Sequence, residues 1–319
     1  MTSDRDRLAS VIVAVNPHDY DFSVVLDSWT TQVGAGAFEV IVAHDGRRRD
    51  LEAEVDRHKL RHPSSTVRSV FADVVGRGAL NNAGVRASRG ALLIFSADDS
   101  RAAPGFVAAH RAFHERLDRP GVGVGPIWFL RALRDVPFRR WLEDSGENYG
   151  FPLTQGAIAW QPGFFFVGNA SLRREVHDEV GGFDERFPYD MHEDHAFGQA
   201  LLAAGYRFTH LPRAYALHDH AVDFDERKEA MRRLGETSVL FGGRYADLAR
   251  VEVRDARDLE ALRRRDREAE RAAAGTTALA AWRRRWIAGF DLAYAEGVLA
   301  ARGGAAVMPP PHEGSRGPA

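Results

Sequence analysis

The sequence predicts a doubly wound α/β fold, built on a largely parallel sheet and followed by a C-terminal helical extension. In its first third, short apolar and β-rich runs alternate with segments of helical character, which is the pattern of a parallel sheet covered by helices. From about Asp225 onward, only helical patterns remain. The chain has 319 residues and is 45% hydrophobic, which is enough apolar material for a large core.

Each predicted strand of the first third is a short apolar or β-branched run, as expected for strands that are buried on both faces. These strands are Val11–Val15, Glu39–Ala43, Val67–Val70 and Ala91–Ser96. The helices between and after them are Phe22–Val33, Asp50–Arg61, Gly78–Ser88 and Gly105–Leu117. Their alternation predicts strand–helix–strand units.

The second half begins with a Gly-, Pro- and Trp-rich stretch and then returns to regular patterns. We predict strands at Phe164–Val167, Tyr206–Leu211 and Tyr215–Leu217, and helices at Leu172–Val180, from Glu193 to Gly205, at Arg254–Ala274 and at Leu279–Leu299. The predicted domains are therefore an α/β domain over residues 1–224, a helical extension over 225–302 and a disordered tail over 303–319.

Composition excludes several function classes. The net charge is -2, so no electrostatic footprint for nucleic acid is present. Cysteine is absent, which excludes a disulfide framework, a thiolate nucleophile and a cysteine zinc site. The sequence shows neither the apolar stretch of a signal peptide nor a run long enough for a transmembrane helix, so we expect a soluble, cytoplasmic protein.

Three predicted strands are followed by polar groups. These are Asn16-Pro17-His18, His44-Asp45-Gly46 and Asp98-Asp99. In open α/β sheets, ligands bind beyond the carboxyl ends of the strands, so these groups are expected to line one pocket. Ordinary turn formation is the alternative for each segment taken alone, because Asn-Pro and Asp-Gly are common turn formers.

Asp98-Asp99 is the most specific of these signals. Two adjacent carboxylates after a buried strand repel each other and lose hydration unless a positive charge lies beside them. Hard oxygen ligands favour Mg²⁺ or Mn²⁺, which usually complete their coordination with phosphates and water. Capping of a turn or helix would explain one aspartate but not the pair.

A second acidic pair, Glu193-Asp194, opens a predicted helix. Stabilisation of the helix dipole is one explanation. The other is that one of the two carboxylates is a general base facing the sheet edge. Either Asp194 or Glu193 could be this base; if it is Asp194, Glu193 is a substrate-binding residue, and a divalent cation near Asp194 would keep the pKa of the base low or ordinary. His218, after the strand-like Tyr215–Leu217, would complete a carboxylate-rich metal site with nitrogen.

Six segments resemble the inverting family 2 glycosyltransferases of the GT-A fold, in the order found in that family. They are VIVAVNPHD, EVIVAHDG, RGALNNAGVRASRGALLIFSADDS, FFFVGNASLRREVHDEVGGFDERF, HEDHAFGQALLAAGYRF and LPRAYALHDH. The resemblance covers Val11 to His220. It implies an enzyme, a glycosyltransferase of hexosyltransferase type that uses a nucleotide-diphosphate sugar as donor.

The resemblance also implies residues for the nucleotide. Asp45 would accept a hydrogen bond from the imide N–H of the donor base, which favours UDP or dTDP donors. Asn16 and Pro17 would lie beside the nucleotide. Arg77 and Asn82 would face the nucleotide or its phosphates.

For the diphosphate and sugar, the resemblance implies that Asp98 holds the ribose and Asp99 the metal. Gly168 and Asn169 would border the donor sugar. Asp194 would take the proton of the acceptor hydroxyl, and His218 would be a further ligand of Mn²⁺ or Mg²⁺.

The chain departs from the family pattern at two places. His44 stands where the family often has an acid, and Phe95-Ser96-Ala97-Asp98-Asp99 lacks one acid of the usual motif. These changes affect the expected contacts to the donor base more than the chemistry.

Two other functions fit parts of the pattern. A nucleotidyltransferase also places paired acids beyond the strands of an α/β sheet, but it typically has a Gly-rich basic loop after the first strand. A non-catalytic nucleotide-sugar-binding or assembly protein would not need the acids and His218.

The tryptophans have two candidate roles. Trp128, Trp141 and Trp160 fall where an acceptor would bind, although aromatic residues are core residues by default. Trp282 and Trp286 are expected to pack on the catalytic domain or across a homodimer interface formed by the C-terminal helices.

Overall fold

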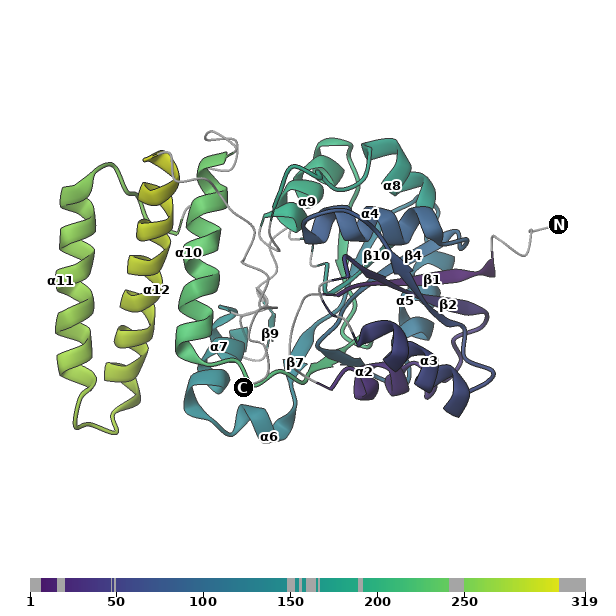
Figure 1. The fold of residues 1–319 in the computed structure, drawn as a ribbon, viewed down its shortest axis with the longest axis horizontal. Helices are drawn as coiled ribbons and strands as arrows, with labels where there is room; N and C mark the ends of the chain where they lie inside the picture. The colour runs from purple at the N-terminus through teal and green to yellow at the C-terminus, as the bar shows by residue number, and fades with distance from the viewer. Residues whose placement is uncertain are drawn as a thin grey trace, which may run out of the picture.

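The computed structural model describes residues 7–15, 21–46, 48, 50–147, 153–154, 157–158, 165, 167–188, 192–240 and 250–303. An α/β body carries the N-terminal part of the chain, and three long helices stand beside it (Figure 1). The predicted fold class is confirmed. The predicted tail lies outside the described residues except for Gly303.

The central sheet has seven strands in the order β11-β6-β10-β4-β1-β2-β3. β3, β2, β1 and β4 are mutually parallel, whereas β10 is antiparallel to both β4 and β6. The strands are β1 (Ala9–Ala14), β2 (Phe38–His44), β3 (Val67–Phe71), β4 (Leu92–Ala97), β6 (Val122–Val124), β10 (Asn169–Arg173) and β11 (Phe208–His210). Since β1 pairs with β2 on one side and β4 on the other, the strand order reverses at β1, where ligands bind in such sheets.

Two layers of helices cover the sheet because successive residues of each buried strand point to opposite faces. Val11 and Val13 pack against one apolar cluster, and Ile12 packs against another. The first cluster lies under α2 (Ser23–Ser28), α3 (Leu51–Arg61) and α5 (Phe106–Glu115). The second lies under α4 (Arg77–Ala87), α8 (Arg174–Val180) and α9 (Glu193–Ala203), on the opposite side in Figure 1.

A second sheet of three strands lies beyond the end of β4. It has the order β5-β12-β7, formed by β5 (Ser100–Ala102), β12 (Ala216–His218) and β7 (Ile127–Phe129). The short helices α6 (Arg131–Arg134) and α7 (Pro137–Ser145) follow β7, and β8 (Leu153–Thr154) pairs with β9 (Ala157–Ile158). This small sheet joins the turn after β4 to a much later segment of the chain.

One predicted strand is misplaced. Of Phe164–Val167, the residues Phe165 and Val167 are described, and both lie outside any strand. The strand is β10, which begins at Asn169 and includes the start of the predicted helix Leu172–Val180. Asn169 and Ser171 are fully buried in it although both side chains are polar.

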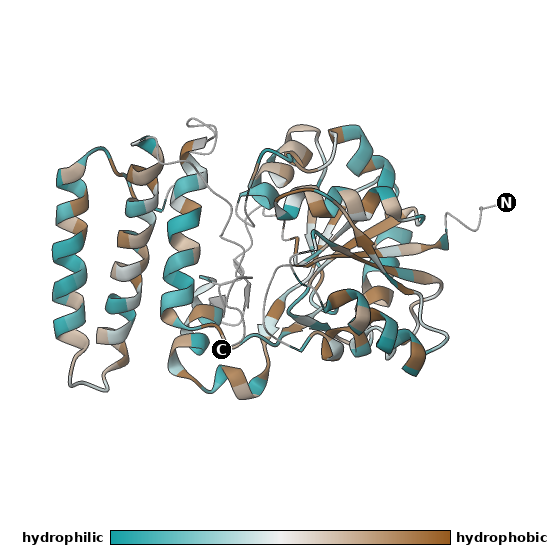
Figure 2. Ribbon diagram, in the orientation of Figure 1, coloured by the Kyte–Doolittle hydropathy of each residue, from teal (hydrophilic) through white to brown (hydrophobic). Residues whose placement is uncertain are grey.

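The C-terminal helices are α10 (Phe224–Leu240), α11 (Ala256–Ala273) and α12 (Leu279–Arg302), with α12 between the other two and α10 next to the α/β body (Figure 1). α11 is strongly hydrophilic over its length (Figure 2), and of its residues only Ala273 is buried. On α12, Trp286 packs at 5.1 Å between ring centroids from Trp141. Among the described residues, no helix is both long enough and apolar enough to cross a bilayer.

Candidate active site

The two acids Asp98 and Asp99 form the turn between β4 and β5. β12 pairs antiparallel with β5, and this register sets His218 opposite Ser100, the residue after Asp99. The backbone N–H of Asp219 donates to the carbonyl of Asp99 at 2.8 Å, which extends the pairing by one residue. The predicted partners Asp99 and His218 are therefore brought together, although 119 positions separate them.

Asp99, His218 and His220 form a cluster of metal-ligand type. Nε2 of His218 lies 2.9 Å from Oδ2 of Asp99, and one ligand atom of each of the three residues lies within 4.8 Å of the others. Because residues alternate along an extended segment, Asp219 turns away, and its carboxylate pairs with the guanidinium of Arg101. Of the three consecutive residues 218–220, the two histidines belong to the cluster and Asp219 does not.

The donor set of this cluster fits a divalent cation. Neighbouring ligands of an octahedral ion with bonds of 2.0–2.1 Å are about 2.9 Å apart, which matches the contact between Asp99 and His218. Between Mg²⁺ and Mn²⁺, two imidazole ligands beside one carboxylate favour Mn²⁺, because imidazole is a ligand of transition metals. His220 also pairs with Glu226 of α10 at 3.1 Å, and this hydrogen bond raises the pKa of His220.

Asp98 lies deeper than Asp99 and has no exposed surface. Its Oδ1 is 3.8 Å from the guanidinium of Arg77, the first residue of α4. The residue before it, Gly76, has φ 94°, and a Cβ there would lie 2.2 Å from the carbonyl oxygen of Phe187. Only glycine fits this close approach, which fixes where α4 begins and thereby brings Arg77 to Asp98.

The helix that carries Glu193 and Asp194 begins next to α4. A Cβ on Gly78 would lie 3.3 Å from that of Glu193, so the two helix starts are in contact. Glu193 is buried, and the side chain of Asp194 is 17% exposed. Arg77 stabilises the ionised form of Asp194 as well as pairing with Asp98, so it connects the two acids electrostatically.

Burial raises the pKa of Asp194, although His195 and Arg77 act in the opposite direction. Burial at the start of α9 disfavours the charged form of this carboxylate. The expectation of a low or ordinary pKa applies to Asp194 near a bound divalent cation and stays a prediction. A raised pKa brings the carboxylate closer to the range in which a general base works best.

Asp45 follows β2 at the same edge of the sheet, one strand away from β1. Its neighbour His44 is buried, and burial lowers the pKa of the imidazole, so this ring is neutral. The ring of Phe71, which is 58% exposed, lies beside His44 and Gly46. An apolar aromatic surface therefore borders the position of Asp45. Asn16 and Pro17 lie outside the described residues.

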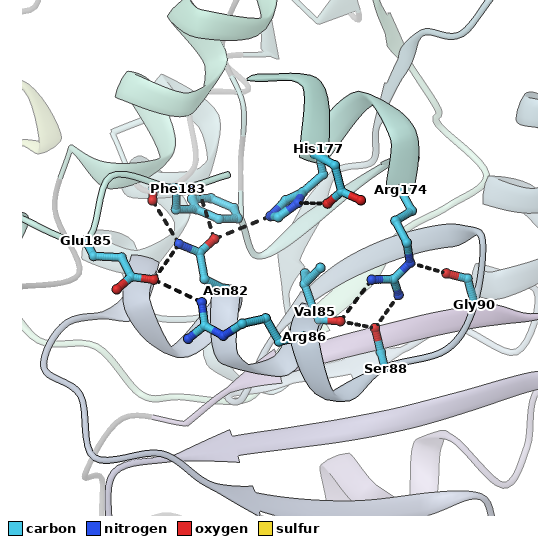
Figure 3. A network of polar contacts seen from close by, with 10 residues as sticks. Asn82, Val85, Arg86, Ser88, Gly90, Arg174, His177, Phe183 and Glu185 are labelled. Carbon is cyan, nitrogen blue, oxygen red and sulfur yellow. Dashed lines mark hydrogen bonds and ion pairs between the residues drawn. The ribbon is translucent and has the colours of Figure 1, made fainter. Parts of the chain in front are cut away.

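Asn82 lies in a network between α4 and the segment after α8 (Figure 3). Its amide nitrogen donates to the carbonyl of Phe183 and to Glu185, both at 2.9 Å, and its oxygen accepts from the N–H of Phe183 at 3.0 Å. His177 lies 3.3 Å from the same oxygen. These contacts use the amide of Asn82 to hold the segment that leads to α9, and none of them involves Asp98 or Asp99.

Gly168 and Asn169 lie at the start of β10. The side chain of Asn169 is buried, donates to the carbonyls of Pro126 and Ala214 at 3.0 and 2.7 Å, and contacts Nε2 of His110 at 2.9 Å. Both the nitrogen and the oxygen of the Asn169 amide therefore have hydrogen-bond partners inside the protein. A Cβ on Gly168 would lie 2.8 Å from Ile127, so the backbone there is closely packed.

The three tryptophans considered for an acceptor have different surroundings. Trp141 is buried in the aromatic cluster with Phe138, Trp286 and Phe290, which is a packing role. Trp128 is half-buried on β7, and Trp160 lies outside the described residues. On α12, Trp286 packs as expected, whereas Trp282 is 39% exposed.

Two site residues were not selected from the sequence. His220 could have been found from its spacing of two from His218 in an extended segment, which places both rings on one face. His192 precedes the acidic pair and has φ 68°, a conformation that no sequence pattern indicated.

Comparisons with known proteins agree with this fold. The family model described as "Glycosyl transferase family 2" matches residues 23–181. Among solved structures, the mannosyltransferase PcManGT from Pyrobaculum calidifontis in complex with GDP-Man and Mn²⁺ is 17% identical, with a TM-score of 0.59 over 93% of this chain and 87% of that chain. TarS 1-349 of S. aureus in complex with UDP-GlcNAc is 16% identical, with a TM-score of 0.51 over 93% and 92%. No curated protein matches the chain.

Proposed function

The chain belongs to glycosyl transferase family 2 and is a glycosyltransferase, and we propose that it transfers a hexosyl group from UDP or dTDP to an acceptor hydroxyl with inversion at the anomeric carbon. The observation that carries this proposal is the position of Arg77, whose guanidinium lies 3.8 Å from Asp98 and whose charge also favours the ionised form of Asp194. This supports an arrangement in which a carboxylate beside the metal-ligand cluster and a second carboxylate for the acceptor share one edge of the sheet.

The donor diphosphate is assigned to the cluster of Asp99, His218 and His220. A bound Mn²⁺ or Mg²⁺ would neutralise the charge that develops on the leaving diphosphate. Asp98, at the buried side of the same turn, holds the ribose. PcManGT, which was solved with GDP-Man and Mn²⁺, supports a divalent cation for this chain.

The donor base is assigned to the edge of β2. The carboxylate of Asp45 accepts the imide N–H of uracil or thymine, and the ring of Phe71 offers an apolar face beside it. Asn16 and Pro17 complete this side of the nucleotide. TarS 1-349 was solved with UDP-GlcNAc and PcManGT with GDP-Man, and the same carboxylate could accept the N1–H of guanine, so the preference for a pyrimidine rests on Asp45 alone.

Asp194 is the proposed general base. As the acceptor oxygen bonds to the anomeric carbon, its proton passes to the carboxylate of Asp194, and the bond from that carbon to the diphosphate oxygen breaks on the opposite face. A single displacement of this kind inverts the anomeric configuration. The raised pKa of Asp194 supports the role, since a more basic carboxylate takes the proton more readily.

The remaining predicted residues take supporting roles in this proposal. Gly168 borders the donor sugar through its backbone, and Glu193 lies beside the base on the substrate side. Asn82 and Asn169 act through the chain segments that they hold, because their amides are engaged there.

The test is a screen of UDP-, dTDP- and GDP-sugars against the full chain, with and without Mn²⁺ or Mg²⁺. Thermal stabilisation reports binding, and released nucleoside diphosphate reports turnover. We expect stabilisation by a UDP- or dTDP-sugar that depends on the ion, slow release of the diphosphate, and a product of inverted configuration once an acceptor is found. Release of pyrophosphate would indicate a nucleotidyltransferase. Binding without any turnover would indicate a non-catalytic nucleotide-sugar-binding protein.

A further inference from the structure

His192 has an unusual backbone conformation immediately before the helix that carries the proposed base. Its φ and ψ are 68° and -14°, and among the described residues it is the one non-glycine residue with positive φ. A bulky residue in the left-handed region is strained and persists only where its surroundings hold it there. Such strain is found most often at functional positions.

The contact that holds His192 comes from the C-terminal helices. Nδ1 of His192 lies 2.7 Å from Oγ1 of Thr237 on α10, and both residues are buried. The hydroxyl proton of Thr237 is directed at the carbonyls of Arg233 and Leu234, at 3.0 and 3.2 Å. The hydroxyl oxygen is therefore the acceptor, and the imidazole donates its Nδ1–H.

Burial lowers the pKa of His192 to about 3, so the ring is neutral at neutral pH. The contact with the Thr237 hydroxyl favours the tautomer that carries its proton on Nδ1. The carbonyl of His192 also accepts the N–H of Ala196 at 2.8 Å, which begins the hydrogen bonding of α9. One residue thus contacts α10 through its ring and starts α9 through its backbone.

We propose that His192 is a positioning residue for Asp194, and that Thr237 holds it in the left-handed turn. Asp194 is two residues further along, in the first turn of α9, so its direction depends on where this helix begins. The C-terminal helices, through α10, are then part of the construction of the active site. The proposal rests on the proposed role of Asp194 as the base.

Three substitutions of His192 separate backbone conformation from hydrogen bonding. His192→Asn tolerates the left-handed conformation and retains an N–H donor for Thr237. His192→Gly retains only the conformation, and His192→Ala retains neither. Thr237→Val removes the acceptor at nearly constant volume. Ser238→Ala is the matched control, because this hydroxyl on α10 donates only to the carbonyl of Gly235 at 2.7 Å in the same helix.

Two measurements are made on each variant. In the transfer assay we expect kcat to fall about tenfold or more in the Gly, Ala and Val variants, with the donor KM changed by less than about threefold, because misplacement of a reacting group costs rate more than binding. His192→Asn and Ser238→Ala should stay within about threefold of the wild type. In hydrogen exchange, the first-turn amides of α9 should exchange faster in the Gly and Val variants but not in the Asn variant.

The outcomes separate this inference from the proposed function. If the wild type transfers no sugar, the proposed function is wrong, while the exchange rates still decide whether Thr237 holds the start of α9. If Thr237→Val leaves both kcat and exchange unchanged, the inference is wrong. The inference is also wrong if His192→Asn has the same kcat as His192→Ala and every variant with a lower kcat also has a lower thermal stability.

Discussion

The guanidinium of Arg77 lies 3.8 Å from the carboxylate of Asp98 and also stabilises the charged form of Asp194. One cation at the start of α4 therefore serves two carboxylates with different proposed tasks. The one beside the metal-ligand cluster must stay ionised, and the other must exchange a proton. This sharing makes the pH dependence of the enzyme sensitive to Arg77.

The first prediction concerns Arg77→Met. Loss of the positive charge raises the pKa of Asp194 further, so a larger share of the base is protonated and the acid limb of the kcat profile moves to higher pH. Arg77→Lys, which retains the charge, should move that limb much less. Steady-state rates between pH 5 and pH 9 check this. An acid limb at the same pH in both variants would contradict the electrostatic link.

The second prediction concerns Asp194→Asn. The amide cannot accept the proton of the acceptor, so kcat should fall by about 10³-fold, as expected for loss of a general base. Binding of the nucleoside diphosphate, measured by calorimetry, should change by less than about threefold, because the metal-ligand cluster is intact. Asp178→Asn, an exposed aspartate on α8, is the control. Equal loss of binding and turnover would argue against the base.

The third prediction compares two neighbouring carboxylates around His218. Asp99→Asn should weaken Mn²⁺-dependent donor binding about tenfold or more, because it removes an oxygen ligand. Asp219→Asn should not, since Asp219 pairs with Arg101 on the other side of the strand. Calorimetry with a nucleoside diphosphate, with and without Mn²⁺, measures the difference. A loss of equal size in both variants would place the ion elsewhere.

The fourth prediction concerns stability in acid. Burial lowers the pKa of His110 to about 4 and that of His114 to about 3, whereas in the unfolded chain a histidine titrates near 6.5. The unfolded state therefore binds more protons below pH 6.5, and the free energy of unfolding falls as the pH is lowered. As the pH falls from 7.5 to 5.5, each of these histidines lowers the free energy of unfolding by about 1.4 kcal/mol.

Urea unfolding of His114→Gln isolates one of these contributions. Glutamine does not titrate. Between pH 7.5 and 5.5, the free energy of unfolding of the variant should therefore fall by about 1.4 kcal/mol less than that of the wild type. His114 contacts Ser171 at 2.9 Å, and glutamine can retain a hydrogen bond there. An identical pH dependence in both proteins would show that this imidazole is not held neutral.

The fifth prediction concerns the crossing of α10 and α12. A Cβ on Gly235 would lie 2.0 Å from the carbonyl oxygen of Tyr294, and one on Gly297 would lie 1.9 Å from that of Arg232. Gly297→Ala must therefore push the helices apart, which should cost about 1–3 kcal/mol or more of stability. Gly105→Ala has open space around it and should stay within about 0.5 kcal/mol of the wild type. Chemical denaturation compares the two, and equal stability would contradict the close crossing.

The parallel part of the fold could be predicted because its signal is local. β1, β2 and β4 are apolar runs followed by polar turns, and each of the four parallel strands β1 to β4 was placed to within about two residues, the usual accuracy of element ends. The same local pattern, an apolar run followed by polar residues, also indicated the two acids of the β4–β5 turn. It also led to His218, because the predicted strand before it is β12.

The parts that were missed depend on distant partners. Asn169 looks like a loop residue until His110, Pro126 and Ala214 supply its hydrogen bonds, and these come from different parts of the chain. The strain at His192 likewise has its cause in Thr237. A sequence pattern reports periodicity and composition, but it does not report which buried polar groups satisfy one another.

The pairing of β12 with β5 has a consequence for the order of assembly. Asp99 is synthesised well before His218, and the two meet only when the late strand has docked against the early one. A nascent chain cannot form the ion-binding centre until the segment through His218 has left the ribosome. Cation capture therefore cannot precede the docking of β12 against β5, and a bound ion would add a link between the turn after β4 and this late strand.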